Sequence, residues 1–350
     1  MRFPEFSGEW EKYRLKDIAN ISKERIGINM LSNNNYISTE NMKPDFGGVD
    51  VAINFPASGN VIKFQKGDTL LSNIRPYLKK IWQAKFDGGC SADIFVFRSN
   101  ILCNSDFLYY TLANEKFILY AMSGAKGVKM PRGDKEQILK YDLHLPTTIE
   151  QNKIASMLSL LDDRIATQIK IIEKLESLIK GLYERLFNID GAAYIQLGNV
   201  AKIQKGQQIN GEELSEIGSY YVMNGGVVPS GYLEDFNTPA NTISISEGGN
   251  SCGYVQYNGV PFWSGGHCYT LIEPINSFNY KYLFHYLKFK EQSIMALRIG
   301  SGLPNIQKKD LERFPILNVS KEEQDKMACI FDDILDRIIC ERQIALKYEE

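Results

Sequence analysis

The sequence predicts an α+β protein with two similar mixed α/β domains, separated by a long antiparallel two-helix coiled coil and related by a pseudo-twofold internal repeat. Three observations support this prediction. An apolar heptad pattern begins at Thr147 and continues to Phe187, a second one begins 173 positions later at Ser320, and the segments before the two patterns share one order of elements. We therefore expect domains at 1–146 and 188–319, and helices at 147–187 and 320–350.

The first domain combines strand-like runs with helices. β-branched and aromatic residues are enriched in the strand-like runs, and Gly-Asp and Gly-Gly pairs separate them. We expect a short helix at 15–21, strands at 61–64, 69–72, 80–86 and 94–97, and a longer helix at 105–122. A glycine turn at 123–127, a short run at 131–139 and an extended segment at 141–145 then lead to the long helix.

The helix predicted at 147–187 carries the heptad pattern. Thr147 with Glu150 gives a capping box at its start, and at ~1.5 Å per residue it reaches about 60 Å, which suits a spacer. The apolar stripe formed by these heptad positions is the seam of the helix, and Gln168 is its polar residue. The seam positions of this helix include Ile154, Leu158, Leu161, Ile165, Gln168 and Ile172.

The second domain repeats the order of the first after a hinge at 188–191. Strand-like runs at 242–246, 254–257 and 268–272 precede a helix at 280–298 and a short helix from 305. Pro304 and Lys308 match Pro131 and Lys135. The middles of the two domains align poorly, whereas their ends align well. We call the repeated ends of each domain the frame and the differing middle the insert.

The second helix repeats the seam. Glu341 takes the place of Gln168, and either the two form a polar layer that fixes the register or the match is a coincidence. Because the second helix is about ten residues shorter, we expect an exposed seam at 175–186 that binds a partner or another copy. The repeated seam positions are Met327, Phe331, Ile334, Ile338 and Glu341.

Polar groups suited to DNA gather in two segments of the first domain. Arg suits guanine, Asn suits adenine and Lys suits phosphate, although a solvated turn or basic face fits the same residues. The candidates from the first segment are Ser72, Asn73, Arg75, Tyr77, Lys79 and Lys80. The candidates around the glycine turn are Lys126, Lys129, Arg132 and Lys135.

The second domain offers a weaker set in the corresponding place, where an ordinary turn is the favoured alternative. Glu247 and Ser251 lie within the same stretch. The candidates are Ser246, Asn250, Tyr254, Gln256 and Tyr257, with Lys308 and Lys309 after the second glycine turn.

Composition limits the remaining classes of function. The chain has 350 residues with a net charge of −2, whereas free nucleic-acid binders are usually more basic, so DNA binding would need basic partners. We expect a cytoplasmic protein without a membrane partner, because no apolar run approaches ~20 residues and no signal-peptide pattern is present. Cysteine and histidine spacing predicts no metal, and we expect no cofactor. Without a P-loop, a cofactor-type glycine motif or an N/D-P-P-Y/F motif, we expect no catalysis by the chain itself.

Three short stretches resemble one family. They are Leu-Pro-Thr-Thr-Ile-Glu-Gln-Asn-Lys-Ile at 145–154, Asn-Val-Ser-Lys-Glu-Glu-Gln-Asp-Lys-Met at 318–327 and Gly-Ser-Gly-Leu-Pro-Asn-Ile at 300–306. The chain resembles the specificity subunit of type I restriction-modification systems over essentially its whole length. The first copy departs from the glycine-loop pattern at 127–133, where it has Gly-Val-Lys-Met-Pro-Arg-Gly.

The resemblance implies a function in DNA recognition. Each domain would read one half of a split double-stranded DNA target, and the helices would set the spacing and bind two methyltransferase subunits. Motor-nuclease subunits would join for restriction, and adenine-N6 methylation would be carried out by the partners. A scaffold that bridges two identical proteins fits the duplication equally well, but it does not explain why the two inserts differ.

Overall fold

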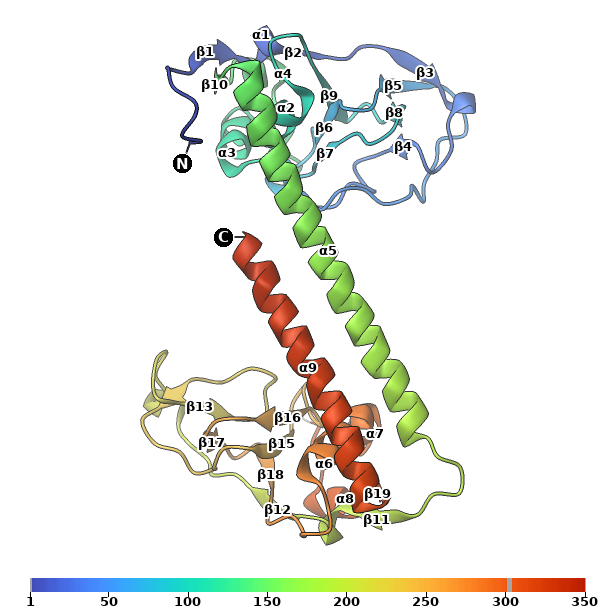
Figure 1. Ribbon diagram of the computed structural model, residues 1–350, viewed down its shortest axis with the longest axis vertical. Coiled ribbons are helices and arrows are strands. Elements are labelled where there is room, and N and C mark those ends of the chain that lie inside the picture. The colour runs from blue at the N-terminus through green and yellow to red at the C-terminus, as the bar shows by residue number, and fades with distance from the viewer. Residues whose placement is uncertain (1, 301–303, 350) are drawn as a thin grey trace. The chain divides into compact units, whose positions relative to one another are not determined.

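The computed structural model describes residues 2–300 and 304–349 (Figure 1). Part of the predicted glycine loop, 301–303, lies outside the described residues. The chain forms two compact units, Met1–Arg164 and Ile165–Glu350, which we call the first and second unit. Within the described residues, no helix is both long and apolar enough to cross a membrane.

The first unit contains two four-stranded sheets and a two-stranded ribbon. The ribbon pairs β1 with β10, the frame sheet has the order β2-β9-β6-β7, and the insert sheet has the order β3-β5-β8-β4. The strands are β1 (Glu11–Arg14), β2 (Ala19–Ile21), β3 (Arg25–Gly27), β4 (Tyr36–Ile37), β5 (Asn60–Phe64), β6 (Thr69–Ser72), β7 (Ile81–Gln83), β8 (Gly88–Cys90), β9 (Ile94–Ser99) and β10 (Asp142–Leu145).

Short helices pack on the frame sheet of the first unit. Leu71 and Phe97 of the sheet share one buried core with Leu108 and Phe117 of the helices, which buries the apolar face of each element. The helices are α1 (Leu15–Ile18), α2 (Ser105–Leu112), α3 (Glu115–Ser123) and α4 (Lys135–Ile138), with 3-10 turns at η1 (Ile28–Met30) and η2 (Pro76–Leu78).

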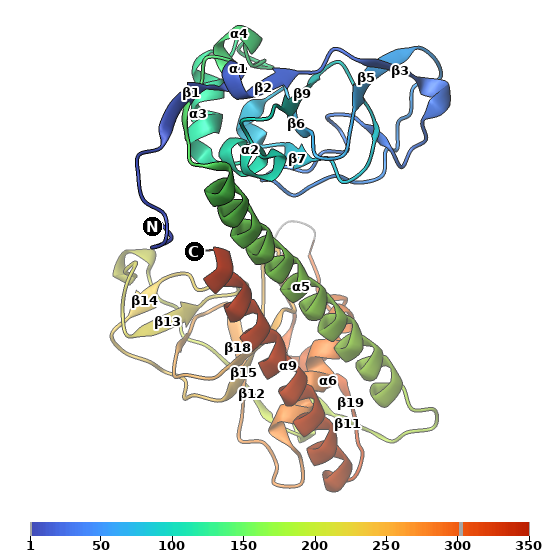
Figure 2. The same cartoon turned by 45° about the horizontal axis from the view of Figure 1, so that its top comes forward.

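The second unit repeats the frame and changes the insert. Its ribbon pairs β11 with β19 (Figure 2). Its frame sheet has the order β12-β18-β15-β16, which matches β2-β9-β6-β7 strand for strand (Figure 1). The insert sheet has three strands, β14-β13-β17, instead of four. The strands are β11 (Tyr194–Gln196), β12 (Lys202–Lys205), β13 (Tyr220–Met223), β14 (Tyr232–Leu233), β15 (Thr242–Ser246), β16 (Val255–Asn258), β17 (Trp263–Ser264), β18 (Cys268–Ile272) and β19 (Pro315–Leu317).

The remaining helices follow the same plan. The remaining helices are α5 (Thr148–Phe187), α6 (Tyr280–Phe289), α7 (Glu291–Met295), α8 (Lys308–Glu312) and α9 (Lys321–Glu349), with 3-10 turns at η3 (Leu197–Asn199) and η4 (Gly211–Glu213). Of these, α5 is a single unbroken helix that starts in the first unit and ends in the second.

Three predicted helices and one predicted strand were too long. The strand expected at 80–86 is β7, Ile81–Gln83. The helix expected at 15–21 ends at Ile18, and Ala19–Ile21 forms β2 instead, because pairing with β9 satisfies its backbone. The helix expected at 105–122 is broken at Asn114, whose side chain caps α3 by accepting from Phe117 N at 3.0 Å. The helix expected at 280–298 is likewise divided into α6 and α7.

The two long helices begin differently. Ser320 and Glu323 form a complete capping box, with Ser320 N donating to Glu323 Oε2 at 3.0 Å and Glu323 N donating to Ser320 Oγ at 3.3 Å. At the start of α5, only the bond from Glu150 N to Thr147 Oγ1 is made, at 3.4 Å. The Glu150 carboxylate instead binds Arg2 at 2.7 Å, and this hydrogen bond lowers its pKa.

A glutamine follows each of these glutamates and joins the long helix to its domain. Gln151 Oε1 accepts from Asn104 N at 2.8 Å, and Gln324 Oε1 accepts from Asn279 N at 2.7 Å. Asn104 and Asn279 are the N-caps of α2 and α6. The repeated Glu-Gln pair thus places the same helix start against the same helix cap in both copies.

Within the second unit, α5 and α9 run antiparallel. Gln168 hydrogen-bonds Glu341, and further along α5 the Tyr183 ring lies 4.6 Å from that of Phe331, so the numbering of one helix rises as that of the other falls. Leu182 and Leu186 pack on the core that contains Phe331. The expectation of an exposed seam at 175–186 was therefore wrong, because antiparallel packing covers the last turns of α5 with the first turns of α9. The predicted α+β class, with two similar mixed α/β domains and an antiparallel helix pair, is confirmed.

Candidate nucleic-acid interface

Several loops meet at one end of the frame sheet in the first unit. Neighbouring strands of this sheet are antiparallel, so β2 and β6 end where β9 and β7 begin. The Ser72–Lys80 segment connects β6 to β7 at this end. A loop held by a rigid sheet is a common place for binding residues.

The glycine-turn segment of the first unit lies against the loop between β6 and β7. Gly133 N donates to Asn73 O at 3.1 Å, and Arg75 N donates to Pro131 O at 2.8 Å. Lys126 and Arg132 exchange two backbone hydrogen bonds of 2.9 Å, which close the turn. The two groups of candidates in the first domain, far apart in the chain, therefore form one cluster.

Carboxylates pair with three of the seven cations in this cluster, Lys79, Lys126 and Arg132. Lys126 binds Asp134 at 2.6 Å and Arg132 binds Asp93 at 3.2 Å. The hydrogen bond from Lys126 lowers the pKa of Asp134, and Lys79 has a raised pKa because it hydrogen-bonds Glu115. Paired charges at an exposed surface contribute little net field.

Two exposed cations of the cluster remain unpaired. In the part of the chain that the structure describes, neither Arg75 nor Lys129 has a hydrogen-bond or ion-pair partner for its side chain. Lys135 also has no ion pair there but is half-buried, and Lys80 Nζ donates to Thr39 O at 2.6 Å. Free guanidinium and ammonium groups are the donors that DNA recognition requires.

The second unit builds the same cluster with different side chains. Ile306 N donates to Glu247 O at 2.8 Å and Gly249 N donates to Pro304 O at 3.0 Å, matching the bonds of Gly133 and Arg75. Ile299 and Asn305 exchange two backbone bonds, as Lys126 and Arg132 do. Glu247 and Gly249 are thus equivalent to Asn73 and Arg75.

The sequence reasoning missed two residues of this second cluster. Lys205 binds the buried Glu247 carboxylate at 2.6 Å, and His267 Nδ1 lies 3.8 Å from its other oxygen. Tyr269 also donates to Glu247 at 3.0 Å. Lys205 is the last residue of β12 and His267 precedes β18, so a correct alignment of the strand ends was the signal that would have identified them.

The remaining candidates of the second unit divide into two groups. Asn250 and Lys309 are exposed, and Lys308 lies 3.6 Å from Glu312 on α8. Tyr254 and Tyr257 instead pack on α6, where Lys288 and Lys281 lie 4.1 and 3.8 Å from their ring centres. Gln256 lies between these two tyrosines in the chain, and its buried Oε1 has no partner.

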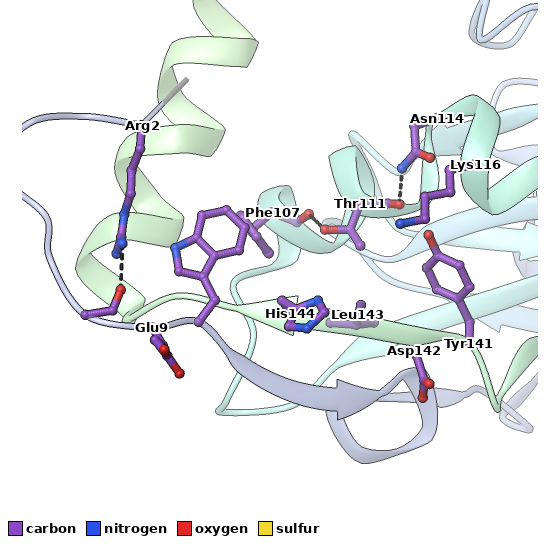
Figure 3. Close-up of a pocket in the computed structure, with 12 residues that line it drawn as sticks. Arg2, Glu9, Phe107, Thr111, Asn114, Lys116, Tyr141, Asp142, Leu143 and His144 are labelled. Atoms are coloured by element: carbon purple, nitrogen blue, oxygen red, sulfur yellow. Dashed lines mark hydrogen bonds between the residues drawn. The ribbon is translucent and has the colours of Figure 1, made fainter.

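None of these candidates lines a groove of the first unit that is shown in Figure 3. It has a volume of ≈ 830 Å³ and lies beside α2, α3 and β10, with Phe107, Thr111 and Asn114 in its lining. Counted from the capping asparagines, these three correspond to Tyr282, Tyr286 and Phe289 of α6. In the second unit those three rings surround Phe187 at 5.3–5.6 Å.

The described residues offer little for catalysis. No group of three or more His, Cys, Asp or Glu side chains among them is arranged to hold a metal ion. Burial raises the pKa of Cys90 and of Cys103 to about 12, which keeps both thiols protonated and unreactive.

The model of the type I restriction modification DNA specificity domain matches the chain twice, at 7–177 and 190–348. The chain belongs to this type I specificity family. Each match contains one α/β domain and the long helix that follows it, in agreement with the internal repeat. The description of the family names DNA specificity.

Curated relatives of the type I specificity family match shorter stretches. A chain of Mycoplasma pneumoniae named as a type I specificity subunit is 37% identical over 122 residues, which cover 34% of this chain and 32% of that one. One of Mycoplasma genitalium is 34% identical over 142 residues, covering 39% and 37%. These matches therefore span about a third of the length of the curated relatives.

Solved structures of the type I specificity family share the fold over the whole chain. The crystal structure of the type I restriction-modification S subunit from M. genitalium aligns with a TM-score of 0.75 and 18% identity, covering 100% of this chain and 96% of that one. A structure from a study of type I assembly and conformational transition aligns with a TM-score of 0.56 and 17% identity, covering 99% and 96%. At such identities the likeness shows the fold alone.

Proposed function

We propose that this chain is the DNA-recognition subunit of a type I restriction-modification complex. Each domain reads one half of a bipartite double-stranded target, and the helix pair sets the unread gap. One observation carries this proposal: the same loop cluster is built twice on the same frame, with different side chains at equivalent positions. Two sites of different chemistry on one chain suit a ligand with two different half-sites.

The proposed division of labour follows the chain. Residues 1–146 and 188–319 form the two recognition domains, and 147–187 and 320–350 form the spacer helices. Contacts to bases and phosphates come from the candidates of the two clusters, from Ser72 to Lys135 in the first domain and from Ser246 to Lys309 in the second. The net charge of −2 supports partners that add basic surface.

Two methyltransferase subunits bind along the helices, and motor-nuclease subunits join for restriction in the cytoplasm. The catalytic step is adenine-N6 methylation or DNA cleavage by those partners. The alternative, a scaffold that bridges two identical proteins, fits the helix pair equally well. It gives no reason for unpaired Arg75 and Lys129 at the end of one sheet, or for the change of insert between the units.

Methylome sequencing of cells that carry the chain with its methyltransferase subunit tests the proposal. We expect a split, adenine-methylated motif that disappears when this chain is omitted. Replacing 194–319 with the same segment of another family member should change one half of the motif and leave the other half unchanged. A methylated motif that persists without this chain, or a swap that alters both halves, would contradict the proposal.

A further inference from the structure

Arg75 has a backbone conformation that side-chain-bearing residues rarely adopt. Its φ is +49° and its ψ is +62°, in the left-handed region. A residue other than glycine is strained there, and such strain persists where the surrounding structure and a function require it. Both main-chain groups of Arg75 are fixed, since its N–H donates to Pro131 O at 2.8 Å and its carbonyl accepts from Leu78 N at 2.9 Å.

The internal repeat supplies a comparison for this position. Gly249 makes the equivalent bond to Pro304 and has a φ of +76°, also left-handed. One copy of the loop therefore uses glycine, which adopts this conformation without strain, while the other copy keeps an arginine. The loop itself does not need the side chain, so the arginine serves another purpose.

Within the described residues, the Arg75 side chain has no polar interaction that would explain its presence. It is exposed, and no hydrogen-bond or ion-pair partner for it lies within the described residues. Lys79, Lys126 and Arg132 in the same cluster all have carboxylate partners. The guanidinium of Arg75 is thus a free planar donor on a rigid support.

We propose that Arg75 is the base-reading side chain of the first domain and that it recognises a guanine in the major groove. This inference rests on the proposed function. A phosphate needs only a positive charge, which the unpaired Lys129 of the same cluster already provides. Guanine presents O6 and N7, which two parallel N–H groups of arginine match, whereas an ammonium group lacks this geometry. The second domain, with Gly249 here, does not read a base at this position.

Two substitutions of Arg75 separate the possible roles. Arg75→Gly removes the guanidinium and relieves the backbone strain, and Arg75→Lys keeps the charge but loses the planar pair of donors. Each variant is assembled with the methyltransferase subunits, and methylation motifs and DNA affinity are measured at one stated salt concentration. Lys116→Gln is the control, since Lys116 is an exposed cation in the groove of Figure 3 and has no ion pair with any residue that the structure describes.

We expect both Arg75 variants to lose the requirement for one guanine in one half of the motif. Affinity for the original target should fall about 5- to 150-fold, and the other half should be unchanged. The unfolding midpoint of Arg75→Gly should be equal to that of the wild type or higher by up to about 2–4 °C. Lys116→Gln should keep the complete motif.

Three results would overturn the inference. An unchanged motif in Arg75→Gly would show that no base is read here. A complete motif in Arg75→Lys, with weaker binding of all sequences by Arg75→Gly, would assign Arg75 to a phosphate. A lower unfolding midpoint for Arg75→Gly, but not for Arg75→Lys, would show that the Arg75 side chain serves the stability of the fold. Failure of the proposed function itself is distinguishable, because the wild-type chain would then give no split motif.

Discussion

Gln168 on α5 and Glu341 on α9 form a buried side-chain hydrogen bond between positions that the internal repeat makes equivalent. Each residue is 2% exposed, and the neighbouring seam positions on both helices are apolar. Arg337 forms an ion pair with the other oxygen of Glu341. A polar layer of this kind fixes the register of a helix pair at a cost in stability.

Gln168→Leu should destabilise the second unit by about 1–3 kcal/mol, because it leaves the buried Glu341 without this donor. The double change of Gln168 and Glu341 to leucine should restore or exceed the wild-type free energy of unfolding. Denaturant titration measures both. A double variant less stable than the wild type would contradict this and would show that the polar pair contributes net stability.

His285 predicts a dependence of stability on pH. It lies on α6, with Nδ1 2.8 Å from Tyr183 OH and Nε2 2.9 Å from Asp332. In the neutral imidazole, Nε2–H donates to the Asp332 carboxylate and Nδ1 accepts from Tyr183 OH. Burial lowers its pKa more than Asp332 raises it. The unfolded chain therefore binds a proton more readily than the folded chain.

Stability should thus be complete above the unfolded pKa of ~6.5 and should decline as pH falls from there toward the lowered pKa of the folded state. In His285→Gln this part of the decline should be absent, although its stability at pH 8 is lower because packing and hydrogen bonds are lost. Thermal unfolding between pH 8 and pH 5 measures both profiles. If stability fell equally steeply with pH in the wild type and in His285→Gln, His285 would not be the group responsible for the decline.

The two glutamines that follow the helix starts should act on different units. Gln151→Ala should lower the stability of the first unit and Gln324→Ala that of the second, each by about 1–3 kcal/mol, since each leaves buried backbone groups unpaired. Calorimetry or hydrogen exchange of single variants locates the effect. Asn152→Ala is a control, because it removes only an exposed bond to Asn104. Equal losses in both units from one substitution would contradict independent roles.

Helix length should determine the unread gap of the proposed DNA target. Four residues inserted between Asp162 and Asp163 lengthen α5 by about 6 Å and leave the contact of Gln168 with Glu341 intact. A four-residue insertion preserves an apolar seam, whereas two residues rotate it away. We expect the gap to grow by about one or two base pairs with the same bases read, and the two-residue insertion to lower stability. An unchanged gap in a folded four-residue variant would contradict the spacer role.

Sequence reasoning worked best where a pattern was long and repeated. The heptads predicted the extent of α5 closely, because many turns of one period leave little ambiguity. Short elements were less predictable: Ala19–Ile21 is apolar in either state, and only pairing with β9 makes it a strand. Asn114 did carry a local signal, since asparagine is a preferred helix N-cap.

The candidate site could be predicted only in part. Arg75 and Asn73 have suitable chemistry, which the sequence displays directly. The strained backbone of Arg75 and its equivalence to Gly249 depend on hydrogen bonds to Pro131 and Pro304, which lie more than fifty residues away in the chain. Pairing of Lys126 and Arg132 with nearby carboxylates was equally invisible, because it depends on side-chain direction.

The loop clusters of both domains are held by main-chain groups, as the bonds of Asn73, Arg75, Glu247 and Gly249 show. Every residue except proline offers the same amide and carbonyl, so these bonds survive when side chains are exchanged. Point mutations at such positions can therefore alter what is bound without a loss of folding. If each domain reads its own half-site, as proposed, this arrangement would let new specificities arise by single substitutions, each independent of the other domain.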